Sequence, residues 1–126
     1  MNLSVKTDQA QQVVDITDRV QKLVKKDAGA VVTYTAHTTC ALSTADLDTG
    51  TDLDILDAIR EMIPKLNYRH PHDPSHVWSH IASTIIGPSV TIPVNGGKLV
   101  LGAWQRIVLI ELDGPRDRQI SVTNLN

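Results

Sequence analysis

Apolar and polar residues alternate near the N-terminus, and the spacing then changes to that of a helix. Residues 2–7 and 11–16 are predicted to form short strands, the second carrying the β-branched residues Val13, Val14 and Ile16. Thr17 stands where a helix N-cap belongs, and the apolar spacing that follows predicts a helix over residues 18–26. Gly29 occupies the position where a left-handed residue often closes a helix. The chain therefore begins as strand, strand, helix.

The middle of the chain combines one buried strand with two longer helices. Residues 30–36 are rich in β-branched side chains and predict a buried strand that ends at His37. From Thr51 to Pro64 the apolar residues recur at helical spacing, and Ser75 is a suitable cap for a second long helix. The predicted apolar face of the first of these helices consists of Leu53, Ile55, Leu56, Ile59, Met62 and Ile63.

Turn signals in the last third predict two hairpins. In residues 90–102, VTIPVNGGKLVLG, the central Asn and Gly residues tolerate the positive φ of a tight turn. A second hairpin is expected where residues 107–112 turn through DGP into residues 118–124. The predicted fold class is α+β, with a mostly antiparallel sheet and about three helices in a single domain over residues 1–126.

Composition limits the partners of the chain. Of the 126 residues, 41% are hydrophobic and 21% charged, which is enough to bury a core, but there is no Phe and the core must consist of aliphatic side chains. A small domain of this kind often recruits subunit contacts. The net charge of −2 and the scattered basic residues argue against nucleic acid as a partner.

The location of the protein is also constrained. The N-terminal residues lack the apolar core of a signal peptide, and no apolar run approaches the ~18 residues that span a membrane. Cys40 has no second cysteine to pair with, which fits a reducing compartment. We therefore expect a soluble, cytoplasmic protein without a membrane partner.

Four of the five histidines lie within residues 69–80. On a helix from Ser75, His76 and His80 would be four residues apart and would project from the same face, as two ligands of one metal ion must. The alternative is that His72 and His76 are solvated surface residues. Both interpretations stay open at this point.

The segment HTTCAL at residues 37–42 places a histidine at the exit of a buried strand. His37 could act as a general acid or base near neutral pH, whereas Cys40, among small apolar neighbours, fits a buried side chain better than a nucleophile. Asp46 opens an acidic run that fails as a calcium loop, and it is the acid nearest to His37 in the sequence. Arg116, in DGPRDR, could grip a phosphate or carboxylate, or could be a solvated hairpin residue.

Several of these segments resemble one family. Two segments resemble the signature of the YjbQ family, a widespread group of small proteins described as secondary thiamine-phosphate synthases. They are SVTIPVNGGKLVLGAWQRI at residues 89–107 and ELDGPRDR at residues 111–118. HTTCAL from His37, YRH at 68–70 and SHIASTIIG at 79–87 fall in the order and spacing of that family. The resemblance thus extends over nearly the whole chain from Ala30 onward.

The resemblance implies an α+β fold that assembles as a homotrimer, with the site near subunit boundaries. The implied site residues are His37, His70, His80, Gln105 and Arg116. Two positions depart from the family pattern: Asp46 stands where a glutamate is usual, and His76 stands where an asparagine is common. Catalysis is then either retained with shifted geometry, or altered or lost.

Three functions follow as hypotheses. The first is a thiamine-phosphate synthase-like enzyme, which joins a pyrimidine diphosphate to a thiazole phosphate and releases pyrophosphate, with His37, Asp46, Gln105 and Arg116 as catalytic residues. The second is a metal-dependent hydrolase or lyase acting on a small phosphorylated metabolite. In it, His70 and His80 hold a divalent ion, zinc or magnesium, and His37 pairs with Asp46 to move protons. The third is a trimer that binds a ligand without turnover.

Overall fold

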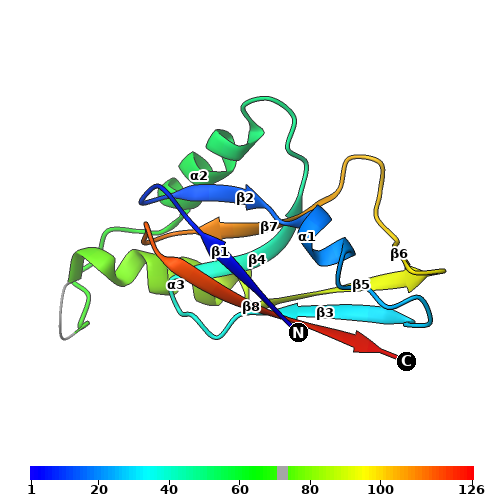
Figure 1. The fold of residues 1–126 in the computed structure, drawn as a ribbon. Helices are drawn as coiled ribbons and strands as arrows, with labels where there is room; N and C mark the ends of the chain where they lie inside the picture. Colours follow the sequence, from blue (N-terminus) through cyan, green and yellow to red (C-terminus); the bar gives the residue numbers. More distant parts are fainter. Residues whose placement is uncertain (71–73) are drawn as a thin grey trace.

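Two antiparallel sheets and three α-helices make up the fold of residues 1–70 and 74–126, which the computed structural model describes (Figure 1). The strands are β1 (Asn2–Lys6), β2 (Gln12–Asp15), β3 (Ala30–Tyr34), β4 (Cys40–Ala45), β5 (Ser89–Asn95), β6 (Lys98–Leu99), β7 (Arg106–Glu111) and β8 (Asp117–Leu125). The helices are α1 (Thr17–Gln21), α2 (Thr51–Met62) and α3 (Val77–Ile86), with a 3-10 turn, η1 (Pro74–His76), ahead of α3. Within these ranges, no helix has the length and apolar character needed to cross a bilayer.

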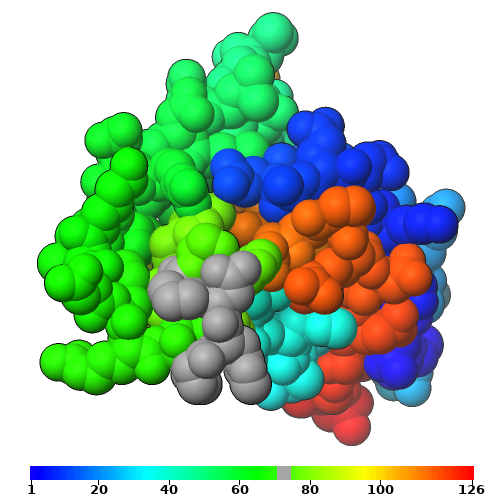
Figure 2. Space-filling view, turned by 90° about the vertical axis from the view of Figure 1, so that its left-hand side faces the viewer, coloured from blue at the N-terminus to red at the C-terminus, as the bar shows by residue number. Residues whose placement is uncertain are grey.

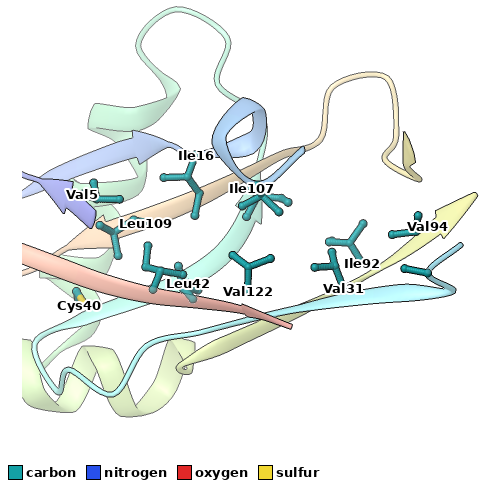
Figure 3. Packing of buried hydrophobic residues seen from close by; sticks show 13 residues of the cluster. Val5, Ile16, Val31, Cys40, Leu42, Ile92, Val94, Ile107, Leu109 and Val122 are labelled. Carbon is teal, nitrogen blue, oxygen red and sulfur yellow. The ribbon is translucent and has the colours of Figure 1, made fainter. Parts of the chain in front are cut away.

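The molecule has three layers. A five-stranded sheet in the order β1-β8-β3-β5-β6 faces a three-stranded sheet in the order β2-β7-β4, and α2 and α3 pack on the far side of the smaller sheet. One apolar core fills the space between the sheets (Figure 3) and a second lies beneath the helices. Strand β7 serves both cores because its side chains alternate: Ile107 and Leu109 join the first, and Val108 and Ile110 join the second. The predicted α+β fold class is confirmed.

The predicted N-terminal helix is shorter than expected, because α1 ends at Gln21 rather than at residue 26. The Gln21 side chain donates to Gly97 O (2.8 Å) and accepts from Leu99 N (3.0 Å), which ties the helix end to the β5–β6 hairpin. Thr17 is not the cap, because its hydroxyl accepts from Ile107 N (2.8 Å) inside the core. Gly29 does not adopt the left-handed conformation predicted for it.

The second predicted hairpin is wrong. Strand β7 lies in the middle of the smaller sheet, where β2 and β4 occupy both of its edges, so β8 pairs with β1 and β3 in the other sheet. The DGP segment therefore crosses between the layers. The strand predicted over residues 30–36 likewise ends at Tyr34, and the chain crosses to the smaller sheet to form β4, an element that was not predicted.

The long helices begin and end nearly where predicted, but their details differ. The half-buried face of α2 contains Ile55, Leu56 and Ile59, whereas Leu53 and Met62 are 61% and 69% exposed. The helix lies at the edge of the fold and contacts mainly β2, so only a narrow stripe of its surface is covered. Helix α3 has no side-chain cap from Ser75, because η1 occupies that position and His76 is the N-cap residue.

The β5–β6 hairpin is confirmed, and its two glycines offer a matched test. Both have positive φ, +59° at Gly96 and +81° at Gly97, but only at Gly97 would a Cβ meet a neighbour, 3.2 Å from the Lys26 Cα. We expect Gly96→Ala to lower the free energy of unfolding by about 1 kcal/mol and Gly97→Ala by roughly 2 kcal/mol, since the second adds a backbone contact to the strain. Urea unfolding measures both, and equal losses would contradict the role given to Lys26.

Candidate functional site

A polar pocket of about 820 Å³ lies where the β3–β4 and β7–β8 crossovers meet the start of α3. Figure 2 shows the segment after β7 (orange), the segment after β3 (cyan) and the residues of α3 (yellow-green) gathered on this face. The pocket is lined by Ala36, His37, Thr38, Thr39, His70, His76, His80, Asp113, Pro115, Arg116, Asp117 and Arg118. The fold thus brings together four of the predicted site residues, His37, His70, His80 and Arg116.

His37 is held against β8 by one ring nitrogen. Its Nε2 accepts a hydrogen bond from the backbone N–H of Gln119 (3.1 Å), so in the neutral ring the proton lies on Nδ1. Burial, followed by the positive charge of Arg118, lowers the pKa of His37 below its ordinary value. A neutral ring whose acceptor nitrogen is occupied can donate a proton or a hydrogen bond. It is not placed to act as a general base.

His70 and His80 form the second part of the site. Their ring centroids lie 4.9 Å apart with an angle of 43° between the planes. Burial, followed by the charge of His70, lowers the pKa of His80. Two imidazoles this close supply two of the four ligands that zinc usually takes. Among the described residues, however, no group of three His, Cys, Asp or Glu side chains is arranged to hold a metal ion.

Asp113 joins His76 and Arg116 at the rim. Its carboxylate lies 3.0 Å from His76 Nδ1 and 3.1 Å from Arg116 Nη2, and its backbone carbonyl accepts from Arg116 Nε (2.7 Å). Burial acts to raise the pKa of Asp113, but the hydrogen bonds from Arg116 and His76 outweigh it and lower the pKa. Arg116 keeps about half of its side chain exposed, so its guanidinium can also reach a ligand.

The floor of the pocket contains a buried ion pair that sequence reasoning missed. Arg118 and Glu111 are 1% and 0% exposed, and Arg118 Nη2 lies 2.6 Å from Glu111 Oε2. Arg118 Nη2 also donates to Thr39 Oγ1 (2.9 Å), and the Thr7 hydroxyl donates to Glu111 Oε1 (2.8 Å). A signal was present: Arg118 stands in register with Ile120 and Val122, so it faces the core, and a buried arginine requires a partner.

Asp46 and Gln105 lie elsewhere in the chain. They line a separate hollow beyond the opposite end of β4, with Thr44 and Trp104, and the Gln105 amide donates to Thr44 Oγ1 (3.1 Å). A six-residue strand spans about 20 Å, so within one chain Asp46 does not reach His37. Its proximity in sequence to His37 was misleading because β4 runs away from the pocket.

Three residues considered in the sequence analysis remain: Cys40, His76 and His72. Cys40 is fully buried in β4, and burial raises the pKa of its thiol, as expected for a side chain of the core rather than a nucleophile. His76 lines the pocket together with His80, but it lies in η1 as the N-cap residue of α3 and not on a face of that helix. His72 lies outside the described residues.

The lowered histidine pKa values predict how stability depends on pH. His37 and His80 bind protons in the unfolded chain near pH 6.5 but stay neutral in the fold to lower pH. Below that pH the unfolded state therefore binds more protons, and the free energy of unfolding decreases as the pH falls. Urea unfolding should show lower stability at about pH 5.5 than at about pH 7.5, and His37→Gln should reduce the difference. Stability that is constant or increases toward low pH would contradict these environments.

Comparison with known proteins gives a consistent result. The family model described as "UPF0047 protein YjbQ-like" matches residues 1–126. A UPF0047 protein from Archaeoglobus fulgidus is 40% identical over 126 residues, covering 99% of this chain and 100% of the relative. The Bacillus subtilis UPF0047 protein YugU is 31% identical, covering 92% and 91%.

Solved structures agree with the sequence matches. The crystal structure of a hypothetical protein from Aeropyrum pernix superposes with a TM-score of 0.90 at 36% identity and covers 100% of this chain and 97% of that one. An uncharacterised YjbQ/UPF0047 protein from Clostridium acetobutylicum superposes with a TM-score of 0.89 at 35% identity, covering 99% of each chain. The fold and its whole length are therefore shared with these proteins.

Proposed function

The chain belongs to the YjbQ-like UPF0047 family, and on that premise we propose that its histidine pocket is the active site of a thiamine-phosphate synthase-like transferase. Such an enzyme joins a pyrimidine diphosphate to a thiazole phosphate and releases pyrophosphate. The observation that supports the proposal is the convergence of His37, His70, His80 and Arg116 on one pocket of about 820 Å³. That volume falls within the usual range for small-molecule sites.

The chemistry requires stabilisation of a departing anion. The thiazole nitrogen supplies the electron pair for a new C–N bond, and the C–O bond to the diphosphate breaks with its electrons on the leaving pyrophosphate. Arg116 offers a half-exposed guanidinium, and His37 offers a neutral N–H donor, for the charge that develops on those oxygens. The pocket therefore contains donors of the kind that pyrophosphate release needs.

A divalent metal fits the site in part. His70 and His80 would hold it, and when bound it would act as a Lewis acid toward phosphate oxygens. Their 4.9 Å ring separation favours a second candidate function, a zinc-dependent hydrolase or lyase on a small phosphorylated metabolite. Metal analysis of the purified protein separates the two, because the second candidate requires about one zinc per chain and loss of activity on chelation.

A homotrimer is part of the proposal. Asp46 and Gln105 lie far from the pocket within one chain, so a catalytic role for them requires a neighbouring subunit to bring them to it. Trp104, beside Gln105, is 74% exposed, and a large apolar side chain in that position suits a subunit contact. Sedimentation equilibrium tests the assembly, and a monomer would remove both residues from the proposed site.

The test of function is pyrophosphate release from the two thiamine precursors. Arg116→Gln and His37→Ala should each lower kcat by about 100-fold or more, because each removes a donor to the leaving group. Arg19→Gln, on α1 and outside the pocket, is the matched control and should retain wild-type turnover. If the wild type releases no pyrophosphate, the transferase proposal fails. Hydrolysis of phosphate esters would then support the second candidate, and binding without turnover would support the ligand-binding trimer.

A further inference from the structure

We propose that Arg118 and His37 form a fixed phosphate-binding subsite at the floor of the pocket, with Arg118 rather than Arg116 as its anchor. Arg118 lines the pocket although only 1% of its residue surface is exposed. The inference deepens the proposed function, on which it rests for the identity of the substrate. The binding of phosphate itself can be measured without turnover.

The guanidinium of Arg118 is fixed from two sides. Its Nε lies 2.8 Å and 3.1 Å from the two carboxylate oxygens of Glu111, and its Nη2 lies 2.6 Å from Oε2 of the same carboxylate. Nη2 also donates to the carbonyl and hydroxyl oxygens of Thr39, at 3.0 Å and 2.9 Å. A guanidinium held in this way keeps its plane and direction, which is the condition for preorganised binding of an anion.

One nitrogen of Arg118 is left for a ligand. Nη1 makes no hydrogen bond to any residue in the described ranges, and no buried side-chain nitrogen or oxygen there lacks a partner. Nη1 therefore remains open to solvent, and the space that Arg118 borders is the histidine pocket. Its two N–H groups are directional donors on a residue that is more than nine-tenths buried.

His37 supplies the second donor. Its Nε2 accepts from the N–H of Gln119, the residue that follows Arg118 on β8, so the ring is fixed against this strand, and both residues line the pocket. The hydrogen on Nδ1 has no acceptor among residues 1–70 and 74–126. The floor thus presents donors from two different elements, and Arg116 adds a third from the rim.

These donors identify the chemical class of the ligand. Neutral acceptors such as a carbonyl would satisfy one donor and leave the others without a partner, whereas an oxyanion accepts several. Donors from the floor and the rim approach along different directions, which suits a tetrahedral phosphate better than a planar carboxylate. The negative charge of Glu111 offsets the positive charge of Arg118. The subsite therefore selects its anion by geometry and hydrogen bonding rather than by net charge alone.

The experiment is calorimetric titration with inorganic phosphate and, separately, with acetate. Arg118→Lys keeps a cation beside Glu111 but has no Nη1, and we expect phosphate affinity to fall about 10- to 100-fold. His37→Gln keeps an acceptor for the Gln119 N–H but places no donor at the position of Nδ1, and should weaken phosphate by about 3- to 10-fold. Arg19→Gln, on α1 and outside the pocket, is the control and should leave phosphate affinity within about twofold.

Each outcome decides the proposal. Phosphate affinity that Arg118→Lys leaves unchanged, wild-type binding of phosphate weaker than about 10 mM, or tighter binding of acetate than of phosphate would each overturn it. If Arg118→Lys does not fold by circular dichroism, the comparison of His37→Gln with Arg19→Gln tests the proposal instead. Phosphate binding that depends on Arg118 without any pyrophosphate release would sink the transferase but keep this subsite. If the wild type releases pyrophosphate but Arg118→Lys binds phosphate as tightly as the wild type, the transferase proposal stands and this subsite is overturned.

Discussion

Glu111→Ala should lower the free energy of unfolding by about 3–5 kcal/mol, the largest loss expected from a single substitution at the site. The substitution leaves the guanidinium of Arg118, which is 1% exposed, without its counter-charge and removes the acceptor of the Thr7 hydroxyl. A buried charge without a partner costs more than the pair contributed, because its desolvation is no longer compensated. Urea unfolding monitored by circular dichroism gives the value.

The control for Glu111→Ala is the double variant Glu111→Leu with Arg118→Met. It removes both charges and restores apolar volume between the sheets, so its loss should be smaller than that of the single variant. Thr7→Val should cost about 2 kcal/mol, because the Thr7 hydroxyl donates to Glu111 Oε1 and accepts from the Arg116 N–H. A double variant less stable than Glu111→Ala would mean that the core depends on the shape of the pair and not on its charge balance.

Gly114→Ala should be nearly as damaging, with a loss of about 3 kcal/mol or more. A Cβ at this position would overlap the carbonyl oxygen of Gln9 and lie 2.6 Å from Glu111 Oε1. The backbone of the crossover would have to shift, and the shift would displace Arg116, two residues later, so affinity for phosphate should fall as well. Thermal unfolding and phosphate titration measure the two effects.

Gly102→Ala is the matched control for Gly114→Ala. A Cβ there would meet only Gln105 atoms at 3.7 Å, which is ordinary contact, and the φ of Gly102 is not positive. We expect a change in the free energy of unfolding within about 0.5 kcal/mol. Similar losses at the two glycines would show that the crossover tolerates a Cβ and that the close approach to Glu111 is unimportant.

Local patterns predicted most elements, because the determinants of those elements are themselves local. The alternation in β1, the β-branched residues of β2, the helical spacing after Thr51 and the Asn-Gly-Gly turn each needed only neighbouring residues. The errors lie where tertiary contacts decide. Helix α1 ends at Gln21, whose side chain bonds to the β5–β6 hairpin. Strand β7 pairs with β2 and β4 on its two edges, so β8 cannot pair with it.

The site residues that meet in the pocket were predicted from the order and spacing of the motifs that resemble the family. His37, His70, His80 and Arg116 do meet in one pocket, although the first and the last are 79 positions apart in the chain. Pairing His37 with Asp46 by closeness in sequence was wrong within one chain, since β4 carries Asp46 to the other end of the sheet. Arg118 could have been inferred from its alternation with apolar residues of β8.

The central claim is that three histidines from distant segments contact one phosphorylated ligand. The most direct measurement is an NMR titration of the histidine ring signals with pyrophosphate, using ring-labelled protein and single His→Gln variants for assignment. We predict that the signals of His37, His70 and His80 shift together along one binding curve, and that Arg116→Gln weakens the common Kd by about 10-fold or more. Rings that do not respond, or that respond with separate affinities, would contradict a shared active centre.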